Sequence, residues 1–146
     1  MNGRLDFVLD STALIALIAK EPGFEKVQEL LERATISAVN LTETIHKLVG
    51  KGSADGLVER LLQGLQLNVA DWFEGLAYSS GEFANLGRSH GLSLGDRACL
   101  TLAKQLHATA VTADRAWRQV PGLGVKILMF RRRRRLPCGR GSVARS

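Results

Sequence analysis

Short apolar runs that alternate with amphipathic helical segments are the feature that most restricts the fold of this chain. The run LDFVL at residues 5–9 and the run TAVTA at residues 109–113 show no alternation between apolar and polar positions. Such runs are typical of strands that are buried on both faces, as in parallel sheets. Strands that alternate with helices therefore predict an α/β fold, with helices covering both faces of the sheet.

The other elements are predicted from the same patterns and from glycine and proline breaks. Additional strands are expected at Thr35 to Val39, at Leu67 to Ala70 and in the closing run VKILMF. Helices are expected at 11–20, 23–34, 40–51, 54–65, 72–90 and 93–107. The elements together predict a three-layer α/β/α sandwich around a central, mostly parallel sheet.

The positive charge of the chain is concentrated at its end. The formal net charge is +6, but residues 131–146 contain seven arginines and no acidic residue. Removing these seven leaves 13 basic residues against 14 acidic ones, a net of about −1 for residues 1–130. We therefore expect one domain over 1–130 and a disordered arginine-rich tail over 131–146, because the tail has few apolar side chains to bury. We assign no function to that tail.

Hydropathy and cysteine content predict a cytoplasmic protein. No apolar run approaches the roughly 20 residues that a membrane span needs, and TALIALIA lacks a basic leader, so neither a membrane helix nor a signal peptide is expected. Cys99 and Cys138 do not have the spacing of a metal site. We expect two free thiols, with Cys99 as a small core residue.

Four acidic residues occupy similar places in the predicted fold. Asp10 ends the first strand, Glu43 is expected in the first turn of the helix after the second strand, Asp96 follows Ser93 in another first turn, and Asp114 follows the fourth strand. The carboxyl ends of parallel strands and the amino ends of the following helices share one edge of a sheet. The four carboxylates are therefore expected to converge at that edge.

Helix capping is the alternative explanation for each acid. NLTE from Asn40 and SLGD from Ser93 have the spacing of a capping box, and Asp10 and Asp114 are placed to cap the turns that follow them. Capping explains any one of the four as well as metal binding does. It does not require all four at one edge.

Metal binding accounts for the four carboxylates together. Clustered carboxylates repel one another unless a cation is present, and oxygen ligands suit Mg²⁺ or Mn²⁺. Such an ion polarises a phosphate, lowers the pKa of water and stabilises a leaving oxygen. The pattern therefore indicates phosphodiester hydrolysis.

Four stretches resemble a known family along nearly all of residues 5–130. They are VLDSTALIALI, SAVNLTETIHKL, GLSLGDRACLTLAKQLHATAVTADRAW and LGVKIL. They are similar to the PIN-domain ribonucleases of the VapC toxin family. The resemblance implies a PIN-like sandwich and a Mg²⁺- or Mn²⁺-dependent endoribonuclease toxin that acts on RNA, pairs with a cognate antitoxin and forms a homodimer.

The resemblance also assigns roles to individual residues. The matching acidic positions, which hold the metal and carry the catalysis, are Asp10, Glu43, Asp96 and Asp114. Thr12 and Thr112 match polar positions where a hydroxyl orients a carboxylate or a water, although each could equally satisfy a helix end. The family reads aspartate, threonine, serine where this chain reads Asp10, Ser11 and Thr12, an exchange that keeps both hydroxyls.

Two other functions share parts of this pattern. A PIN fold that binds RNA or a protein without cutting is one, and the presence of all four acids argues against it. A metal-dependent phosphatase or a DNA-directed flap nuclease is the other, and the compact length argues against the nuclease form.

Other side chains have simpler expected roles. We expect core packing for most of the residues in one group, Trp72, Phe73, Phe83 and Trp117. His46 lies three residues after Glu43, but one such pair without further histidines is a poor metal signature. We expect solvated or ion-paired surface roles for a second group, Lys47, Lys51, Arg88, Arg97 and Arg115. Contacts from some of these basic residues to RNA are the alternative.

Overall fold

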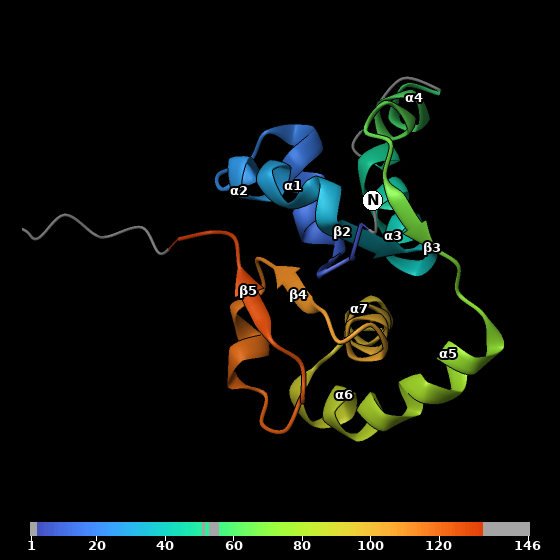
Figure 1. Ribbon diagram of the computed structural model, residues 1–146, viewed down its shortest axis with the longest axis vertical. Coiled ribbons are helices and arrows are strands. Elements are labelled where there is room, and N and C mark those ends of the chain that lie inside the picture. The colour runs from blue at the N-terminus through green and yellow to red at the C-terminus, as the bar shows by residue number, and fades with distance from the viewer. Residues whose placement is uncertain (1–2, 51, 53–55, 133–146) are drawn as a thin grey trace, which may run out of the picture.

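The computed structural model describes residues 3–50, 52 and 56–132 (Figure 1). Of the tail predicted over 131–146, the part from residue 133 onward, with Cys138, lies outside the described residues, as does Lys51. In chain order the elements are β1 (Phe7–Leu9), α1 (Ser11–Ala19), α2 (Phe24–Leu30), η1 (Leu31–Arg33), β2 (Ala34–Ser37), α3 (Ala38–Val49), α4 (Leu57–Gly64), β3 (Asn68–Ala70), α5 (Glu74–Ser79), η2 (Ser80–Phe83), α6 (Ala84–His90), α7 (Leu94–Gln105), β4 (Thr109–Thr112), η3 (Arg115–Gln119) and β5 (Ile127–Met129), where η denotes a 3₁₀ helix.

The sheet has five strands in the order β3-β2-β1-β4-β5, and every pairing among them is parallel. The chain builds outward from β1 through β2 to β3, then returns to add β4 on the other side of β1. The strand order therefore reverses between β1 and β4, which in an open α/β sheet is the place where ligands bind.

Helices cover both faces of the sheet, which confirms the three-layer α/β/α sandwich. Figure 1 shows α1 to α4 on one side of the strands and α5 to α7 on the other. Neighbouring residues of β1 belong to opposite layers: Leu9 belongs to the core cluster that includes residues of α1, α2 and α4, whereas Val8 belongs to the cluster that includes residues of α7. In β4, Val111 and Ala110 divide in the same way. Both faces of these strands are buried, which is why β1 and the centre of β4 are apolar.

One wrong boundary changes the place of a site residue. The second strand ends at Ser37 and α3 begins at Ala38, whereas the sequence predicted a strand to Val39 and a helix from Asn40. Ser37 is the N-cap, because its hydroxyl accepts a hydrogen bond of 3.1 Å from the backbone N–H of Asn40. Glu43 consequently lies in the second turn of α3 and not in its first.

Two predicted helices are divided in the structure. The segment 72–90 forms α5, η2 and α6, with the 3₁₀ turn η2 around Gly81. The segment 23–34 ends early, because α2 passes into the 3₁₀ helix η1 before β2 starts.

Core packing was expected for most of four aromatic residues, and two of the four lie in the core. Phe83 and Trp117 are buried, whereas Trp72 is half-buried and Phe73 is exposed. Cys99 is a fully buried core residue of α7, as predicted. Among the helices of the described ranges, none has the length and apolar content to span a membrane.

Candidate active site

Four acidic side chains are placed around the end of the central strands. Asp10 directly follows β1, and Asp114 comes two residues after β4, the parallel neighbour of β1. The backbone N–H of Asp10 donates to the carbonyl of Val111 at 3.1 Å, so the ends of the two strands are fixed together. Glu43 and Asp96 reach the same edge from α3 and α7.

Asp10 is the buried member of this group, with only 3% of its surface exposed. Its Oδ1 accepts from the Thr12 hydroxyl at 2.6 Å and from the backbone N–H of Ala13 at 3.0 Å, which makes Asp10 the N-cap of α1. Its Oδ2 accepts from the Thr112 hydroxyl at 2.5 Å. Both carboxylate oxygens are therefore held in place by hydroxyl groups.

The same two threonines also hold the backbone around the site. Thr12 Oγ1 accepts a hydrogen bond of 2.9 Å from the N–H of Ala113, and Thr112 Oγ1 accepts one of 3.0 Å from the N–H of Asp114. Each hydroxyl thus donates to Asp10 and accepts from the segment after β4. The predicted positions of Thr12 and Thr112 beside the acids are those found in the structure.

Burial makes ionisation of Asp10 unfavourable. Desolvation raises the pKa of Asp10 from 3.8 to about 6, although hydrogen bonds from Thr112, Thr12 and Ala13 oppose the shift. The negative charge of Asp96 adds to the increase. A nearby cation would reverse this balance by stabilising the ionised form.

Asp96 is both a capping residue and a member of the acidic group. It forms a capping box with Ser93: the hydroxyl of Ser93 accepts from the N–H of Asp96 at 3.1 Å, and Asp96 Oδ2 accepts from the N–H of Ser93 at 2.9 Å. Desolvation raises the pKa of Asp96, and the charges of Asp114 and Glu43 add to the increase. The Asp96 side chain therefore caps α7 and also interacts electrostatically with the other acids.

Glu43 approaches the backbone at the start of α7. A Cβ atom added to Gly95 would lie 2.7 Å from Glu43 Oε2 and 2.8 Å from Oε1, closer than such contacts occur in proteins. Only glycine at position 95 leaves room for the carboxylate. Lys47 lies 4.0 Å from Glu43 Oε2, in the same helix.

Asn40 is a site residue that the sequence did not identify. Its side chain is buried; its Nδ2 donates to the carbonyl of Gly95 at 2.9 Å, and its Oδ1 accepts from the Ser37 hydroxyl at 2.8 Å. The bond between Asn40 and Gly95 joins α3 to α7 at the residue that the Glu43 carboxylate approaches. The available signal was the position of Asn40, which is three residues before Glu43 and so lies on the same side of the helix.

Asp114 is the exposed member of the group. It caps η3, because its Oδ1 accepts from the N–H of Ala116 at 2.9 Å. Exposure thus increases from Asp10, through the half-buried Glu43 and Asp96, to Asp114. The acidic site extends from the end of β1 to the surface.

The donor set suits a hard divalent cation, since it consists of carboxylate and hydroxyl oxygens. The charge of Asp96 raises the pKa of Asp10, and the charges of Asp114 and Glu43 raise that of Asp96. The charges of Asp10, Asp96 and Glu43 also reach the buried Cys99 and, after desolvation, raise the pKa of its thiol. Within residues 3–50, 52 and 56–132, however, no three or more His, Cys, Asp or Glu side chains form a ready metal-binding group. The acids are electrostatically coupled and would have to move closer to share one ion.

The histidine and basic residues considered in the sequence analysis differ in their exposure and contacts. His46 is exposed. Lys47 contacts Glu43 and lies 3.4 Å from the hydroxyl of Ser11, and Arg88 hydrogen-bonds to Asn85. Among the described residues neither Arg97 nor Arg115 forms an ion pair, so the surface ion pair predicted for each is wrong.

Several solved structures have the same fold. A VapBC2 complex from Rickettsia felis bound to promoter DNA matches with 19% identity, 84% of this chain and 96% of that chain covered, and a TM-score of 0.66. A DNA-bound VapBC from Salmonella typhimurium matches with 24% identity, coverage of 86% and 98%, and a TM-score of 0.65. A toxin–antitoxin complex from Klebsiella pneumoniae matches with 18% identity, coverage of 86% and 98%, and a TM-score of 0.61.

Comparison by sequence identifies the family. No curated protein matches this chain, but the family model for the PIN domain matches residues 7–123. That match extends from β1 to the segment before β5 and includes all four acids of the site. The chain therefore belongs to the PIN domain family.

Proposed function

We propose that this protein is a Mg²⁺- or Mn²⁺-dependent endoribonuclease of the VapC type, the toxin of a toxin–antitoxin pair. The observation that carries the proposal is the buried Asp10 carboxylate, held by two threonine hydroxyls and electrostatically coupled to Asp96, which is in turn coupled to Glu43 and Asp114. A buried carboxylate with a raised pKa beside other acids is costly for a fold and typical of functional sites.

The four acids would hold the ion in different ways. Asp10 and Asp96 are the proposed direct ligands, and Glu43 and Asp114 complete the site directly or through water. When bound, such an ion polarises the phosphate and lowers the pKa of water. Thr12 and Thr112 keep the Asp10 carboxylate in one orientation, and Asn40 joins α3, the helix of Glu43, to α7.

A non-cleaving PIN module that binds RNA or protein is the second candidate. It predicts RNA or partner binding that persists when a site carboxylate is replaced, without any metal-dependent cleavage. The coupled acids favour the enzyme, because simple binding gives no reason to bury Asp10 beside Asp96 at the cost shown by their raised pKa values.

A protein partner is part of the proposal. The structural relatives include complexes described as VapBC and as toxin–antitoxin. An apolar groove of about 470 Å³ lies beside α3 and α4 and has the character of a surface that receives an amphipathic helix. Its lining residues include Leu41, Ile45, Leu62, Leu67 and Val69. We assign this groove to the antitoxin.

A homodimer is proposed from a separate apolar surface. Val49 of α3 and Leu57 and Leu61 of α4 are exposed large hydrophobic side chains. We call these three residues the α3–α4 patch. Exposed apolar side chains that gather on neighbouring helices mark protein contacts.

The test is cleavage of pooled RNA by purified protein, free of antitoxin, with Mg²⁺, Mn²⁺ or a chelator. Asp96→Asn is the variant that removes a site carboxylate. Asp6→Asn is its matched control, because Asp6 precedes β1 at the opposite edge of the sheet and forms ion pairs with Arg4 and Arg33 there.

Discrete metal-dependent fragments are expected from the parent and the Asp6→Asn protein and not from Asp96→Asn. Equal cleavage by Asp96→Asn would refute the proposed site. RNA binding without cleavage in the parent would favour the non-cleaving module.

A further inference from the structure

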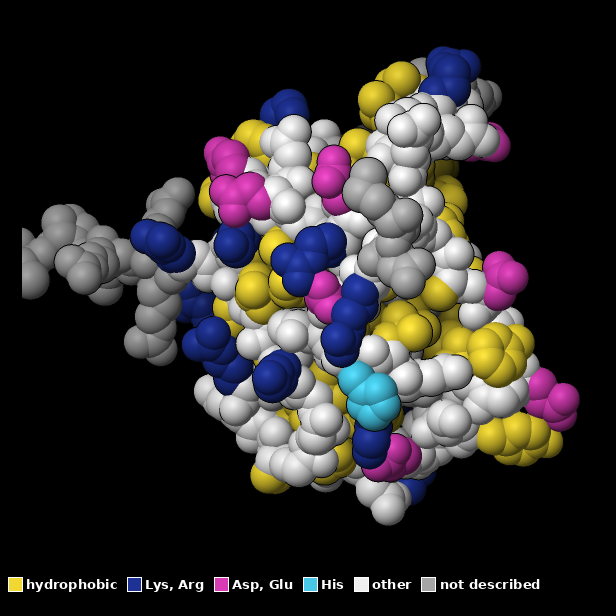
Figure 2. Space-filling model, viewed as in Figure 1, with side chains coloured by type: hydrophobic (Ala, Val, Ile, Leu, Met, Phe, Trp, Pro, Cys, Tyr) yellow, Lys and Arg dark blue, Asp and Glu magenta, His cyan; other side chains and the backbone are white. Residues whose placement is uncertain are grey.

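A second feature of the same sheet edge is a pocket rich in arginine. Its cavity volume is about 490 Å³, and its lining residues are Arg115, Arg118, Gln119, Met129, Arg131 and Arg132. No acidic side chain of the described residues lines it. In Figure 2, Lys and Arg side chains gather on the left and centre of the face shown, around a few acidic ones.

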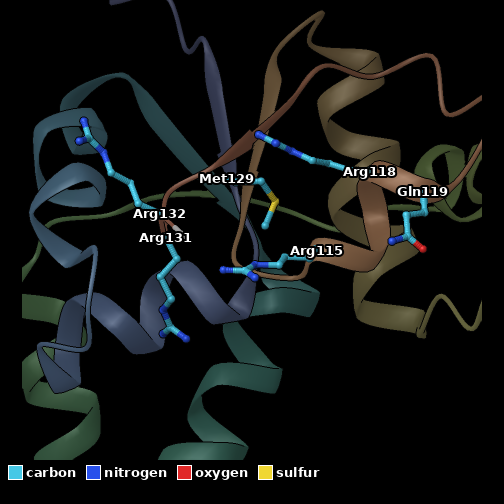
Figure 3. Close-up of a pocket in the computed structure, with 6 residues that line it drawn as sticks. All are labelled: Arg115, Arg118, Gln119, Met129, Arg131 and Arg132. Carbon is cyan, nitrogen blue, oxygen red and sulfur yellow. The ribbon is translucent and has the colours of Figure 1, made fainter. Parts of the chain in front are cut away.

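The 3₁₀ helix η3 presents two of these arginines together. Side chains three residues apart are eclipsed in a 3₁₀ helix, so Arg115 and Arg118 project from the same side of η3. Trp117 between them is buried and anchors η3 on the core. Figure 3 shows both guanidinium groups extending from η3 toward Met129 of β5.

The position of the pocket follows from the order of the strands. β5 pairs with β4 in parallel, with Met129 opposite Thr112, the residue that donates to Asp10. Arg131 and Arg132 therefore follow the end of β5 at the same edge where the acids follow β1 and β4. Along that edge, acidic residues after β2, β1 and β4 give way to arginines after β5.

The charge of this pocket is largely uncompensated. Arg131 pairs with Glu21 at 2.6 Å and donates to the carbonyl of Pro22. Within the described part of the chain, the side chains of Arg115 and Arg118 have neither an ion pair nor a hydrogen bond. Two exposed guanidinium groups without partners, held on one side of an anchored turn, suit bidentate contacts with phosphate.

We infer that Arg115 and Arg118 bind backbone phosphates of a single-stranded RNA that runs from the acidic site toward β5. The inference rests on the proposed nuclease function. It adds the path of the RNA across the protein and two residues that position the RNA. The acids surround the phosphodiester that is cut, and the arginines hold phosphates on one side of it. Arginine at this end of the edge also offsets the repulsion between the acidic site and the RNA backbone.

The experiment measures binding separately from cleavage. A fluorescein-labelled oligouridylate is titrated with the full-length protein in chelator over a series of salt concentrations. The test variant is Arg115→Gln with Arg118→Gln. The control is Arg60→Gln with Lys126→Gln, which removes the same charge from exposed positions on α4 and ahead of β5.

The test variant is expected to bind the oligouridylate at least tenfold more weakly than the parent at low salt. Its slope of log affinity against log salt should fall by about 1.4, since each phosphate contact on a single strand contributes about 0.7. The control variant should retain the slope of the parent. An unchanged slope in the test variant, or an equal loss in the control, overturns the inference.

Cleavage assays on the same variants separate this inference from the proposed function. If Asp96→Asn abolishes cleavage but the arginine variant binds RNA like the parent, the nuclease stands and the pocket assignment fails. If the arginine variant loses binding but the parent does not cleave, the pocket stands and the nuclease fails. A labelled oligoglutamate, titrated in the same way, tests an acidic peptide as the alternative ligand. If the arginine variant loses oligoglutamate binding but binds RNA like the parent, the pocket binds an acidic peptide and the inference is overturned.

Discussion

The hydroxyl of Thr112 donates a hydrogen bond of 2.5 Å to Asp10 across 102 residues of sequence. The two residues stand at the ends of neighbouring parallel strands, and Thr112 Oγ1 also accepts from the backbone N–H of Asp114. One hydroxyl therefore joins the buried acid of the site to the segment that carries the exposed acid.

Replacing Thr112 by valine keeps the shape of the side chain and removes this connection. The Thr112→Val protein should lose about 1–3 kcal/mol of unfolding free energy, measured by urea denaturation, because buried polar groups lose their partner. Its manganese affinity near neutral pH should also fall, since this hydrogen bond lowers the pKa of Asp10. Thr112→Ser should recover both properties, and Thr42→Val, at an exposed threonine of α3, is the control.

The raised pKa of Asp10 predicts a dependence of stability on pH. With a pKa of about 6 in the folded protein and 3.8 in the unfolded chain, Asp10 destabilises the metal-free protein fully above pH 6. This cost disappears as the pH falls from 6 toward 3.8, because the Asp10 carboxyl of the folded protein is then protonated and no buried charge remains. In chelator, Asp10→Asn should therefore be more stable than the parent by up to about 3 kcal/mol at neutral pH, with a smaller difference in acid.

Urea denaturation of both proteins across this pH range checks the prediction, and manganese adds a second measurement. Manganese should stabilise the parent and not Asp10→Asn, because only the parent gains binding energy in the folded state. A parent whose stability relative to Asp10→Asn is independent of pH would contradict the assigned pKa.

Gly95 offers a test that separates folding from metal binding. The Cβ of Gly95→Ala would meet the Glu43 carboxylate, which is the end of a flexible side chain and can turn away. Alanine also favours a helix over glycine by about 1 kcal/mol. We therefore expect unfolding free energy within about 1 kcal/mol of the parent, together with a loss of manganese affinity of about tenfold or more.

Calorimetric titration with manganese and urea denaturation measure the two effects in the Gly95→Ala protein. Gly64→Ala is the control, because a Cβ atom there meets nothing within 4 Å. Unchanged manganese affinity in Gly95→Ala would mean that Glu43 does not contribute to the site.

The α3–α4 patch predicts association between copies of the chain. Sedimentation velocity should show a dimer in the parent and a shift toward monomer in Leu61→Lys, because a charge at an apolar contact is costly to bury. Leu61 is exposed in the single chain, so the unfolding free energy of the Leu61→Lys protein should differ little from that of the parent. Tyr78→Lys, at an exposed position on α5, is the control, and an equal shift in that variant would refute the assignment.

The sequence by itself determined the class of fold and predicted which four acids converge at one edge of the sheet. Short apolar runs that alternate with helical segments are typical of strands that are buried on both faces, so the run at residues 109–113 indicated a covered parallel sheet. Parallel strands end at a common edge, which is why Asp10 and Asp114 could be expected near each other before the structure was known.

Only the tertiary structure decided which groups support those acids. The local pattern at Asn40 is that of a helix cap, but its side chain is buried and holds the carbonyl of Gly95, 55 residues away. Arg115 was likewise expected to form a surface ion pair, and it lines a pocket with arginines from beyond β5 instead. Caps and periodicity depend on neighbours in sequence, whereas these contacts depend on how distant strands and helices pack, which short-range patterns do not encode.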